Sequence, residues 1–153
     1  MRVDDDEVVF RQVRLDMFPE DSGRPLPLAF RPSSADEQEG QQRGELVQLS
    51  VWDAHRTTPE QATSIRERER GGPVAPSKTV CLRVGRVREL SEPSVLGLDV
   101  VRAPLVLSVE GADGHCGITG LGKRDHPTSK RLRKRYMFEL ARSCQPGTSW
   151  RKP

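Results

Sequence analysis

Hydrophobic and polar residues alternate in several short runs of the chain, which is the pattern of β-strands with one covered face. In the run LVQLSVW, the residues Val47, Leu49 and Val51 fall on one face. Ser50 and Trp52 fall on the other face. The same criterion predicts strands in four further runs, which are EVVFRQVRLDMF, LPLAF, TVCLRVGRV and LDVV. We therefore expect a sheet with at least one face packed against a core.

A β-hairpin is predicted in the stretch PLVLSVEGADGHCGITGL, where two alternating runs flank the glycine-rich turn GADG. The parity of this turn gives a core face made of Leu105, Leu107, Val109, Cys116 and Ile118. Glu110 and His115 then face each other on the opposite side. A carboxylate that orients an imidazole is the arrangement of a general base, so Glu110 and His115 are the candidate catalytic pair. The alternative is a solvated cross-strand pair without a catalytic role.

One short surface helix is predicted in the run TTPEQATSIRERERGG. Thr58 suits the N-cap, Gln61 completes a capping box with it, and Gly71 suits the C-terminal end. Among the inward positions only Ala62 and Ile65 are apolar. This helix is therefore expected to lie on the surface and to bury little.

A second helix is predicted over residues 128–144, because Pro127 and Thr128 suit its start and Pro146 suits its stop. At about 100° per residue, one arc of this helix collects Leu132, Tyr136, Met137, Leu140 and Cys144. That arc is expected to face the core.

The opposite face of the same helix is basic and contains an aromatic residue. The candidate partner-binding residues are Arg131, Lys134, Arg135, Phe138 and Arg142. Arginines around an exposed ring stack on it, make cation–π contacts and bind anions with two hydrogen bonds. Two alternatives stay open: the basic face is merely solvated, or the acidic run Asp4–Glu7 neutralises it within the domain.

These elements predict an α+β fold, with a largely antiparallel sheet, a C-terminal helix packed on it and one short surface helix. A chain of 153 residues is long enough for one domain with its own core. We expect this domain to span residues 1–144 and to carry a long polar loop at 31–45. Residues 145–153 are expected to form a flexible C-terminal tail.

The net charge of +3 hides a division of charge along the chain. Residues 123–153 carry ten Lys or Arg against Asp125 and Glu139, a local balance of +8, so residues 1–122 sum to −5. Such a division is informative about partners. The predicted function is a small intracellular interaction module without catalytic activity, whose basic C-terminal helix contacts an acidic protein partner. Nucleic acid is the alternative partner, and a small enzyme is the further alternative.

Disulfides, metals and cofactors are not expected. The three cysteines Cys81, Cys116 and Cys144 are separated by 35 and 28 residues, which suits reduced buried thiols better than a disulfide framework. Cys116 and His115 point to opposite faces of a strand and so cannot form a catalytic dyad. A metal site from His115, His126 and a cysteine lacks any recurring ligand spacing. No phosphate-loop or dinucleotide-binding motif occurs.

The N-terminal sequence MRVDDDEVVF is acidic and lacks the apolar segment of a signal peptide. No uncharged apolar run approaches the length of a bilayer span. A cytoplasmic protein without membrane association is therefore expected.

One further enzyme alternative depends on the order of three residues along the chain. Arg31, Ser50 and Glu110 follow the order in which ADP-ribosyltransferases place a catalytic Arg, a Ser on a strand and a Glu at a strand end. The stretch LSVW resembles that family in its serine, but Trp52 stands where the family has a second serine. Gly111 stands where it has a second nearby glutamate. A divergent site similar to that family's is the last alternative.

Overall fold

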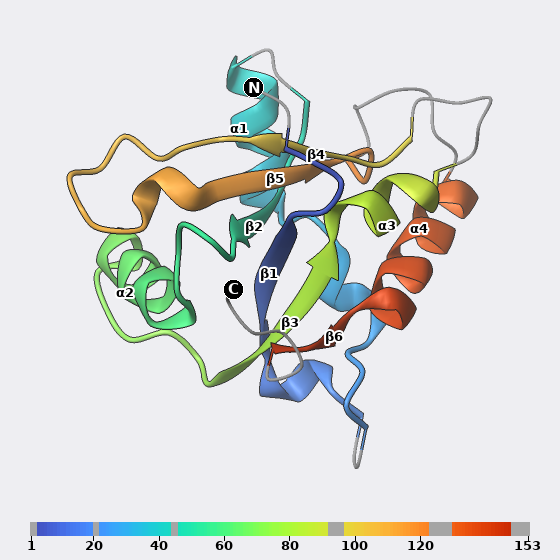
Figure 1. Cartoon of the computed structure of the whole chain (residues 1–153), viewed down its shortest axis with the longest axis horizontal. Helices are drawn as coiled ribbons and strands as arrows, with labels where there is room; N and C mark the ends of the chain where they lie inside the picture. The colour runs from blue at the N-terminus through green and yellow to red at the C-terminus, as the bar shows by residue number, and fades with distance from the viewer. Residues whose placement is uncertain (1–2, 20–21, 44–45, 92–96, 123–129, 148–153) are drawn as a thin grey trace.

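An antiparallel sheet forms the centre of the molecule (Figure 1). The structure is a computed structural model, and it describes residues 3–19, 22–43, 46–91, 97–122 and 130–147. Within these residues the sheet has six strands in the order β4-β5-β2-β1-β3-β6, and every neighbouring pair is antiparallel. The strands are β1 (Val8–Arg14), β2 (Leu49–Asp53), β3 (Ser77–Arg83), β4 (Asp99–Arg102), β5 (His115–Thr119) and β6 (Gln145–Pro146).

Helices cover both faces of this sheet, with α2 and α4 on opposite sides of the molecule (Figure 1). The α-helices are α1 (Ser34–Arg43), α2 (Pro59–Arg70), α3 (Val84–Glu89) and α4 (Lys130–Ser143). Short 3-10 segments are η1 (Leu15–Met17), η2 (Pro27–Phe30) and η3 (Ala112–Gly114). The predicted α+β class is therefore confirmed.

The larger hydrophobic core lies between one face of the sheet and the elements α3, α4 and η2. Alternate strand residues such as Val9, Leu49 and Ile118 point into it. Phe30 of η2 and Tyr136 of α4 are completely buried against them. The apolar arc of α4 explains this arrangement, because burying that face of the helix against the sheet removes apolar surface from water, which is favourable.

A smaller core lies on the other face of the sheet, beneath α2. Trp52 and Phe10 supply most of its volume from the sheet, and α2 contributes its buried residues Ala62 and Ile65. The two faces of β2 are thus divided as the alternation predicts, with Leu49 in the larger core and Trp52 in the smaller one.

The ends of α2 are those that the sequence predicts. The Thr58 hydroxyl accepts a hydrogen bond from the Gln61 backbone at 3.1 Å, and the Gln61 side chain accepts one from the Thr58 backbone at 2.9 Å. Gly71 ends the helix at φ +79°, a left-handed conformation that favours glycine.

The predicted hairpin is built differently. The preceding strand that pairs with β5 is β4, with Arg102 opposite Cys116, and the run 103–110 is an irregular connection between them. Leu105 and Val109 do not join Cys116 in the larger core but pack on the smaller one. In this run the alternating apolar residues therefore pack an irregular connection against the smaller core. Periodicity alone does not distinguish such a connection from a strand.

Three other strand predictions differ from the structure: the one for LPLAF is wrong, and those for EVVFRQVRLDMF and TVCLRVGRV extend too far, the former because Leu15–Met17 forms η1. The run LPLAF forms η2, in which Pro27 occupies the first turn and Ala29 and Phe30 are buried. Proline fixes a φ angle that suits a helical first turn, and it removes a donor that a strand ladder would use. The run TVCLRVGRV leaves the sheet at Arg83, because Val84 begins α3.

The polar stretch 31–45 is not simply a loop, because residues 34–43 form α1. Ser33 and Asp36 cap its start reciprocally: the Ser33 hydroxyl accepts from the Asp36 backbone at 3.1 Å, and the Asp36 carboxylate accepts from the Ser33 backbone at 2.8 Å. The predicted tail is also shorter at its beginning, since Gln145 and Pro146 form β6 against β3. Residues 148–153 lie outside the described residues.

At the outer edge of β4, the backbone groups of Val100 are already hydrogen-bonded to side chains. Ala103 donates its N–H to His115 across the ladder, so alternation turns Val100 and Pro104 outward. The outward N–H of Val100 donates to the Asp99 carboxylate at 2.8 Å, and its carbonyl accepts from Arg88 at 3.3 Å. Pro104 has no N–H to offer.

A partly buried ion network around Arg102 ties β4 to β2 and to the start of β1. The guanidinium donates to Asp53 at 2.9 Å and to both carboxylate oxygens of Glu7 at 3.0 and 3.1 Å. The Asp53 side chain is 1% exposed, and that of Arg102 is 12% exposed. The hydrogen bond with Asp53 contributes most to a raised pKa of Arg102, so this group stays charged.

Replacing Arg102 with Ala is expected to lower the free energy of unfolding by about 3 kcal/mol, because the buried Asp53 carboxylate would lose its hydrogen-bonded cation and keep only the more distant Arg56, at 3.7 Å. Urea denaturation measures this loss. The control Arg86→Ala removes an ion pair with Glu89 in which the side chains are 48% and 69% exposed. The control is expected to cost less than about 1 kcal/mol. Equal losses in the two variants would contradict a structural role for the Arg102 network.

Candidate functional site

Helix α4 presents a cationic face with an aromatic residue on it. The structure places all five candidate partner-binding residues at exposed positions, and we call them the α4 patch: Arg131, Lys134, Arg135, Phe138 and Arg142. The Phe138 side chain is 53% exposed, although it is a large apolar group. Tyr136 and Leu140, on the opposite face of the helix, are fully buried. The division of the helix into two faces is therefore confirmed, while the contact role of the patch stays a prediction.

Five cations of α4 lack, among the described residues, the acidic partners that several other arginines of the chain have. Within the residues that the structure describes, no ion pair involves Lys130, Arg131, Arg133, Lys134 or Arg142. Several of these side chains lie in the first turns of the helix, where the helix dipole disfavours cations. This surface therefore carries positive charge that an anionic group would stabilise.

The acidic N-terminal run has other partners. Asp5 forms an ion pair with Arg88, and Glu7 pairs with Arg102 at 3.0 Å. Arg88 also holds Asp99 at 2.8 Å. The hypothesis that this run neutralises the C-terminal helix is therefore wrong for Asp5 and Glu7.

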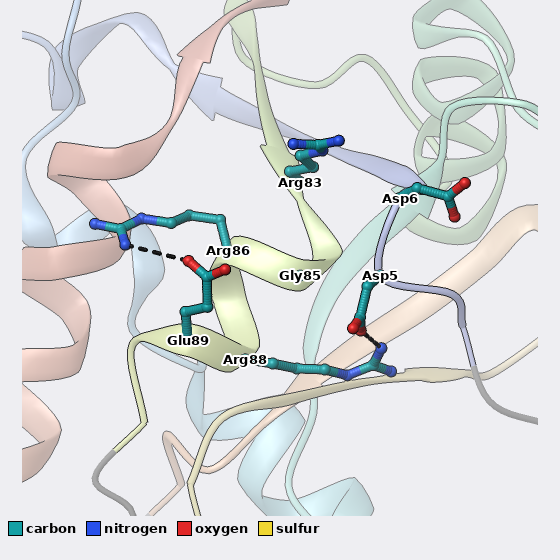
Figure 2. A pocket seen from close by; sticks show the side chains of 7 residues that line it. All are labelled: Asp5, Asp6, Arg83, Gly85, Arg86, Arg88 and Glu89. Carbon is teal, nitrogen blue, oxygen red and sulfur yellow. Dashed lines mark hydrogen bonds and ion pairs between the residues drawn. The ribbon is translucent and has the colours of Figure 1, made fainter.

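A hollow lies between this acidic run and α3 (Figure 2). It measures about 550 Å³ and is lined by Asp5, Asp6, Arg83, Gly85, Arg86, Arg88 and Glu89. Figure 2 shows the Arg86 side chain directed at Glu89, at 3.5 Å, and the Arg88 side chain directed at Asp5. Three cations and three anions line this hollow, so their charges cancel. We interpret these residues as holding the N-terminal segment against α3, and not as a ligand site.

The predicted pairing of Glu110 with His115 is wrong. Glu110 is exposed in the connection between β4 and β5, whereas His115 begins β5 and is partly buried. The side of the strand predicted for His115 is nevertheless confirmed, because Cys116 and Ile118 point into the larger core and His115 contacts Trp52 on the other face. The imidazole and indole rings meet edge to face at a centroid distance of 4.9 Å.

His115 is hydrogen-bonded to Ser50, a partner that the sequence does not reveal. The Ser50 hydroxyl meets Nε2 of His115, and Nδ1 lies 2.8 Å from the carbonyl oxygen of Ala103. A carbonyl only accepts, so Nδ1 carries the proton and Nε2 accepts from the serine. Both residues were correctly predicted to point away from the larger core, but no local signal pairs β2 with β5.

Arg11 lies beside this serine. Its guanidinium donates to the Ser50 carbonyl at 2.7 Å and to the Ala29 carbonyl at 2.8 Å. Among the described residues it forms no ion pair with a carboxylate. Burial lowers the pKa of Arg11 to about 10. Arg11 of β1 thus holds the backbone of Ser50 in place, and no carboxylate among the described residues pairs with its charge.

The three thiols are free and buried, as the cysteine spacing predicts. Burial raises the pKa of Cys81, of Cys116 and of Cys144 to about 11 in each case. In the described part of the chain no cluster of His, Cys, Asp and Glu is arranged to hold a metal ion. His126 lies outside the described residues.

The resemblance to ADP-ribosyltransferases fails at its third residue. Arg31 is exposed after η2 and Ser50 does lie on a strand, but Glu110 is far from either strand end, since β4 ends at Arg102 and β5 begins at His115. The order of three residues along the chain therefore does not correspond to that family's strand-end glutamate.

No family model matches the chain, and comparison with curated proteins and with solved structures returned no significant match. A search of the described helices for one long and apolar enough to cross a bilayer found none. Function is therefore inferred from the residues and geometry of this chain.

Lowering the pH is expected to destabilise the fold through His115. Burial lowers the pKa of His115 below its ordinary value of 6.5, so between these two values the unfolded chain binds a proton that the folded chain does not. The free energy of unfolding therefore decreases as the pH falls from 6.5 through the folded pKa. Melting temperatures measured across this pH range should fall with pH, and the fall should be smaller in the His115→Gln variant. If the melting temperature of His115→Gln changed with pH in parallel with that of the wild type, the role of His115 would be contradicted. The control is His55→Gln, at an exposed histidine.

The thiols are expected to resist alkylation. With pKa values of about 11, Cys81, Cys116 and Cys144 are almost entirely protonated at neutral pH, and the thiolate is the reactive form. Intact mass after iodoacetamide treatment should show no adduct on the folded chain and three adducts on the chain in urea. Replacing Cys116 with Ala is expected to cost about 1 kcal/mol, as loss of a small packed group.

Proposed function

We propose that this chain is a small cytoplasmic interaction module that binds an acidic protein partner through the α4 patch. The observation that carries the proposal is that Arg131, Lys134 and Arg142, which form no ion pair within the described residues, share one helix face with a half-exposed phenylalanine. The cytoplasmic assignment is supported by the three unpaired thiols, which a reducing compartment preserves.

Charge supports an anionic counterpart. Cations without ion pairs, such as Arg131, Lys134 and Arg142, leave a positive surface that is open to a carboxylate. Arginine binds a carboxylate with two parallel hydrogen bonds, which adds orientation to attraction. An anion near the start of α4 would also offset the unfavourable interaction of Lys130 and Arg131 with the helix dipole.

Phe138 supports a protein counterpart. An exposed aromatic ring surrounded by arginines is the composition of an interface hot spot, in which the ring enters an apolar pocket and the charged rim orients the complex. A phosphate backbone offers charge but no such pocket. The first 122 residues sum to −5, so the rest of the chain repels a long polyanion, which also favours a protein with a local acidic surface.

Replacing Phe138 with Ala is expected to weaken partner binding by about 2 kcal/mol, or about 30-fold in Kd, because the ring loses its burial in the complex. The melting temperature should hardly change, since the ring is 53% exposed in the free chain. Calorimetric titration with a partner captured by the wild-type chain measures the loss. The matched control is Val106→Ala, which removes another exposed apolar side chain away from α4.

Capture itself is to be compared between the wild-type chain and the double variant Arg131→Glu/Arg135→Glu. The control is Arg68→Glu/Arg70→Glu, which reverses two exposed arginines on α2. Loss of the partner only with the α4 variant supports the proposal. Capture that survives α4 reversal would overturn it, and capture abolished by nuclease would identify nucleic acid as the partner instead.

A further inference from the structure

We propose that Ser50 and His115 form a nucleophile and general-base pair that cleaves small neutral or cationic activated esters. This activity lies outside the α4 patch. Three features on one face of β2 and β5 support this proposal. The Ser50 hydroxyl is hydrogen-bonded to the His115 imidazole, the tautomer of that imidazole is fixed, and the neighbouring Gln48 amide has no hydrogen-bond partner in the described part of the chain.

The first feature is the bond between the two reacting groups. Ser50 lies opposite Gly117 in the β2–β5 pairing, and His115 is two residues from Gly117 on the same face, so the two side chains are diagonal neighbours. The hydroxyl donates to Nε2, the geometry in which imidazole removes a proton from serine. Both residues are half-buried.

The second feature is the orientation of the imidazole. Nδ1 donates to the Ala103 carbonyl at 2.8 Å, and the Trp52 ring packs edge to face against the imidazole. These contacts keep Nε2 unprotonated and directed at Ser50. Arg11 acts as a positioning residue, because its hydrogen bond to the Ser50 carbonyl fixes the strand that carries the nucleophile.

The third feature is Gln48, which precedes Ser50 by two residues and lies just before β2 begins. Its side chain lies over Gly117, where a Cβ atom would come within 2.4 Å of the amide oxygen. Glycine at this position therefore leaves room for the amide beside Ser50. Among the described residues that amide has no hydrogen-bond partner. Side-chain amides stabilise the oxyanion in acyl transfer, and Gln48 is placed to donate to it.

The surroundings select the charge of the substrate. Carboxylates from two helices, Asp36 and Glu39 of α1 and Glu69 of α2, act on His115 electrostatically. They act against burial, which has the largest effect on the pKa of His115 and lowers it, and so they favour the imidazolium that forms when serine loses its proton. The same negative charges attract a cationic substrate and repel an anionic one.

The reaction proceeds in two balanced stages. The Ser50 oxygen attacks the ester carbonyl carbon while its proton passes to Nε2 of His115. The bond between this carbon and the leaving oxygen or sulfur then breaks, and the leaving group takes the proton from His115, which leaves an acylated serine. Water attacks the acyl carbon, gives a proton to His115 and releases the carboxylic acid, and Ser50 recovers its proton.

The test uses the full chain with acetylthiocholine as a cationic ester, p-nitrophenyl acetate as a neutral one and a fluorophosphonate as a covalent probe. Mass spectrometry is expected to locate the phosphonyl adduct on Ser50, and hydrolysis of the cationic ester should exceed that of an anionic analogue. Ser50→Ala is expected to reduce hydrolysis about 100-fold, as is typical when acid–base catalysis by the pair is lost. The matched control Ser108→Ala, at an exposed serine in the 103–110 connection, should leave the rate unchanged.

The role of His115 has its own readout. His115→Ala should lose activity, and added imidazole should restore part of it if the ring acts as the base. Circular dichroism establishes that each variant is folded. An adduct on another residue, or a folded Ser50→Ala variant with the wild-type rate, would overturn the proposal, as would a folded wild type that neither reacts with the probe nor hydrolyses any of these esters.

Discussion

The register between β2 and β5 is the constraint on which the rest of the structure depends. Val51 lies opposite Cys116 and Trp52 lies opposite His115, so the two strands agree on which residues face each side. A shift by one residue would turn Val51 and Ile118 out of the larger core and would separate Ser50 from His115. The pairing of β2 with β5 thus directs apolar residues to both cores. It also brings Ser50 and His115 together on the face of the sheet that carries the smaller core.

The arginines of this chain serve two different purposes. Arg88 and Arg102 bind acidic side chains and connect the N-terminal segment to α3 and β4, with little charge left over. Lys134 and Arg142 of α4 have no ion pair within the described residues. Because Asp5 and Glu7 pair with Arg88 and Arg102, they do not neutralise α4, which keeps surface charge for a partner. The same internal pairing explains why the hollow beside α3 offers little net charge to a ligand.

The two proposals concern separate parts of the molecule. Helix α4 packs on the larger core, whereas Ser50 and His115 lie on the opposite face of the sheet, next to the smaller core. A variant at Phe138 therefore leaves the serine and its base in place, and a variant at Ser50 leaves the α4 patch in place. Binding through α4 and acyl transfer at Ser50 can be tested independently, and the failure of one does not decide the other.

The sequence by itself determined the features that depend on near neighbours along the chain. Capping at Thr58 and Gly71, the two faces of α4 and the two faces of β2 all follow from spacing, because their causes lie within a few residues. Only the tertiary structure decided that β4 pairs with β5 in place of the run 103–110, that Asp5 pairs with Arg88, and that Ser50 meets His115. These contacts join residues 65 or more positions apart in two of the cases, and alternation fixes a residue's face but not the strand beside it.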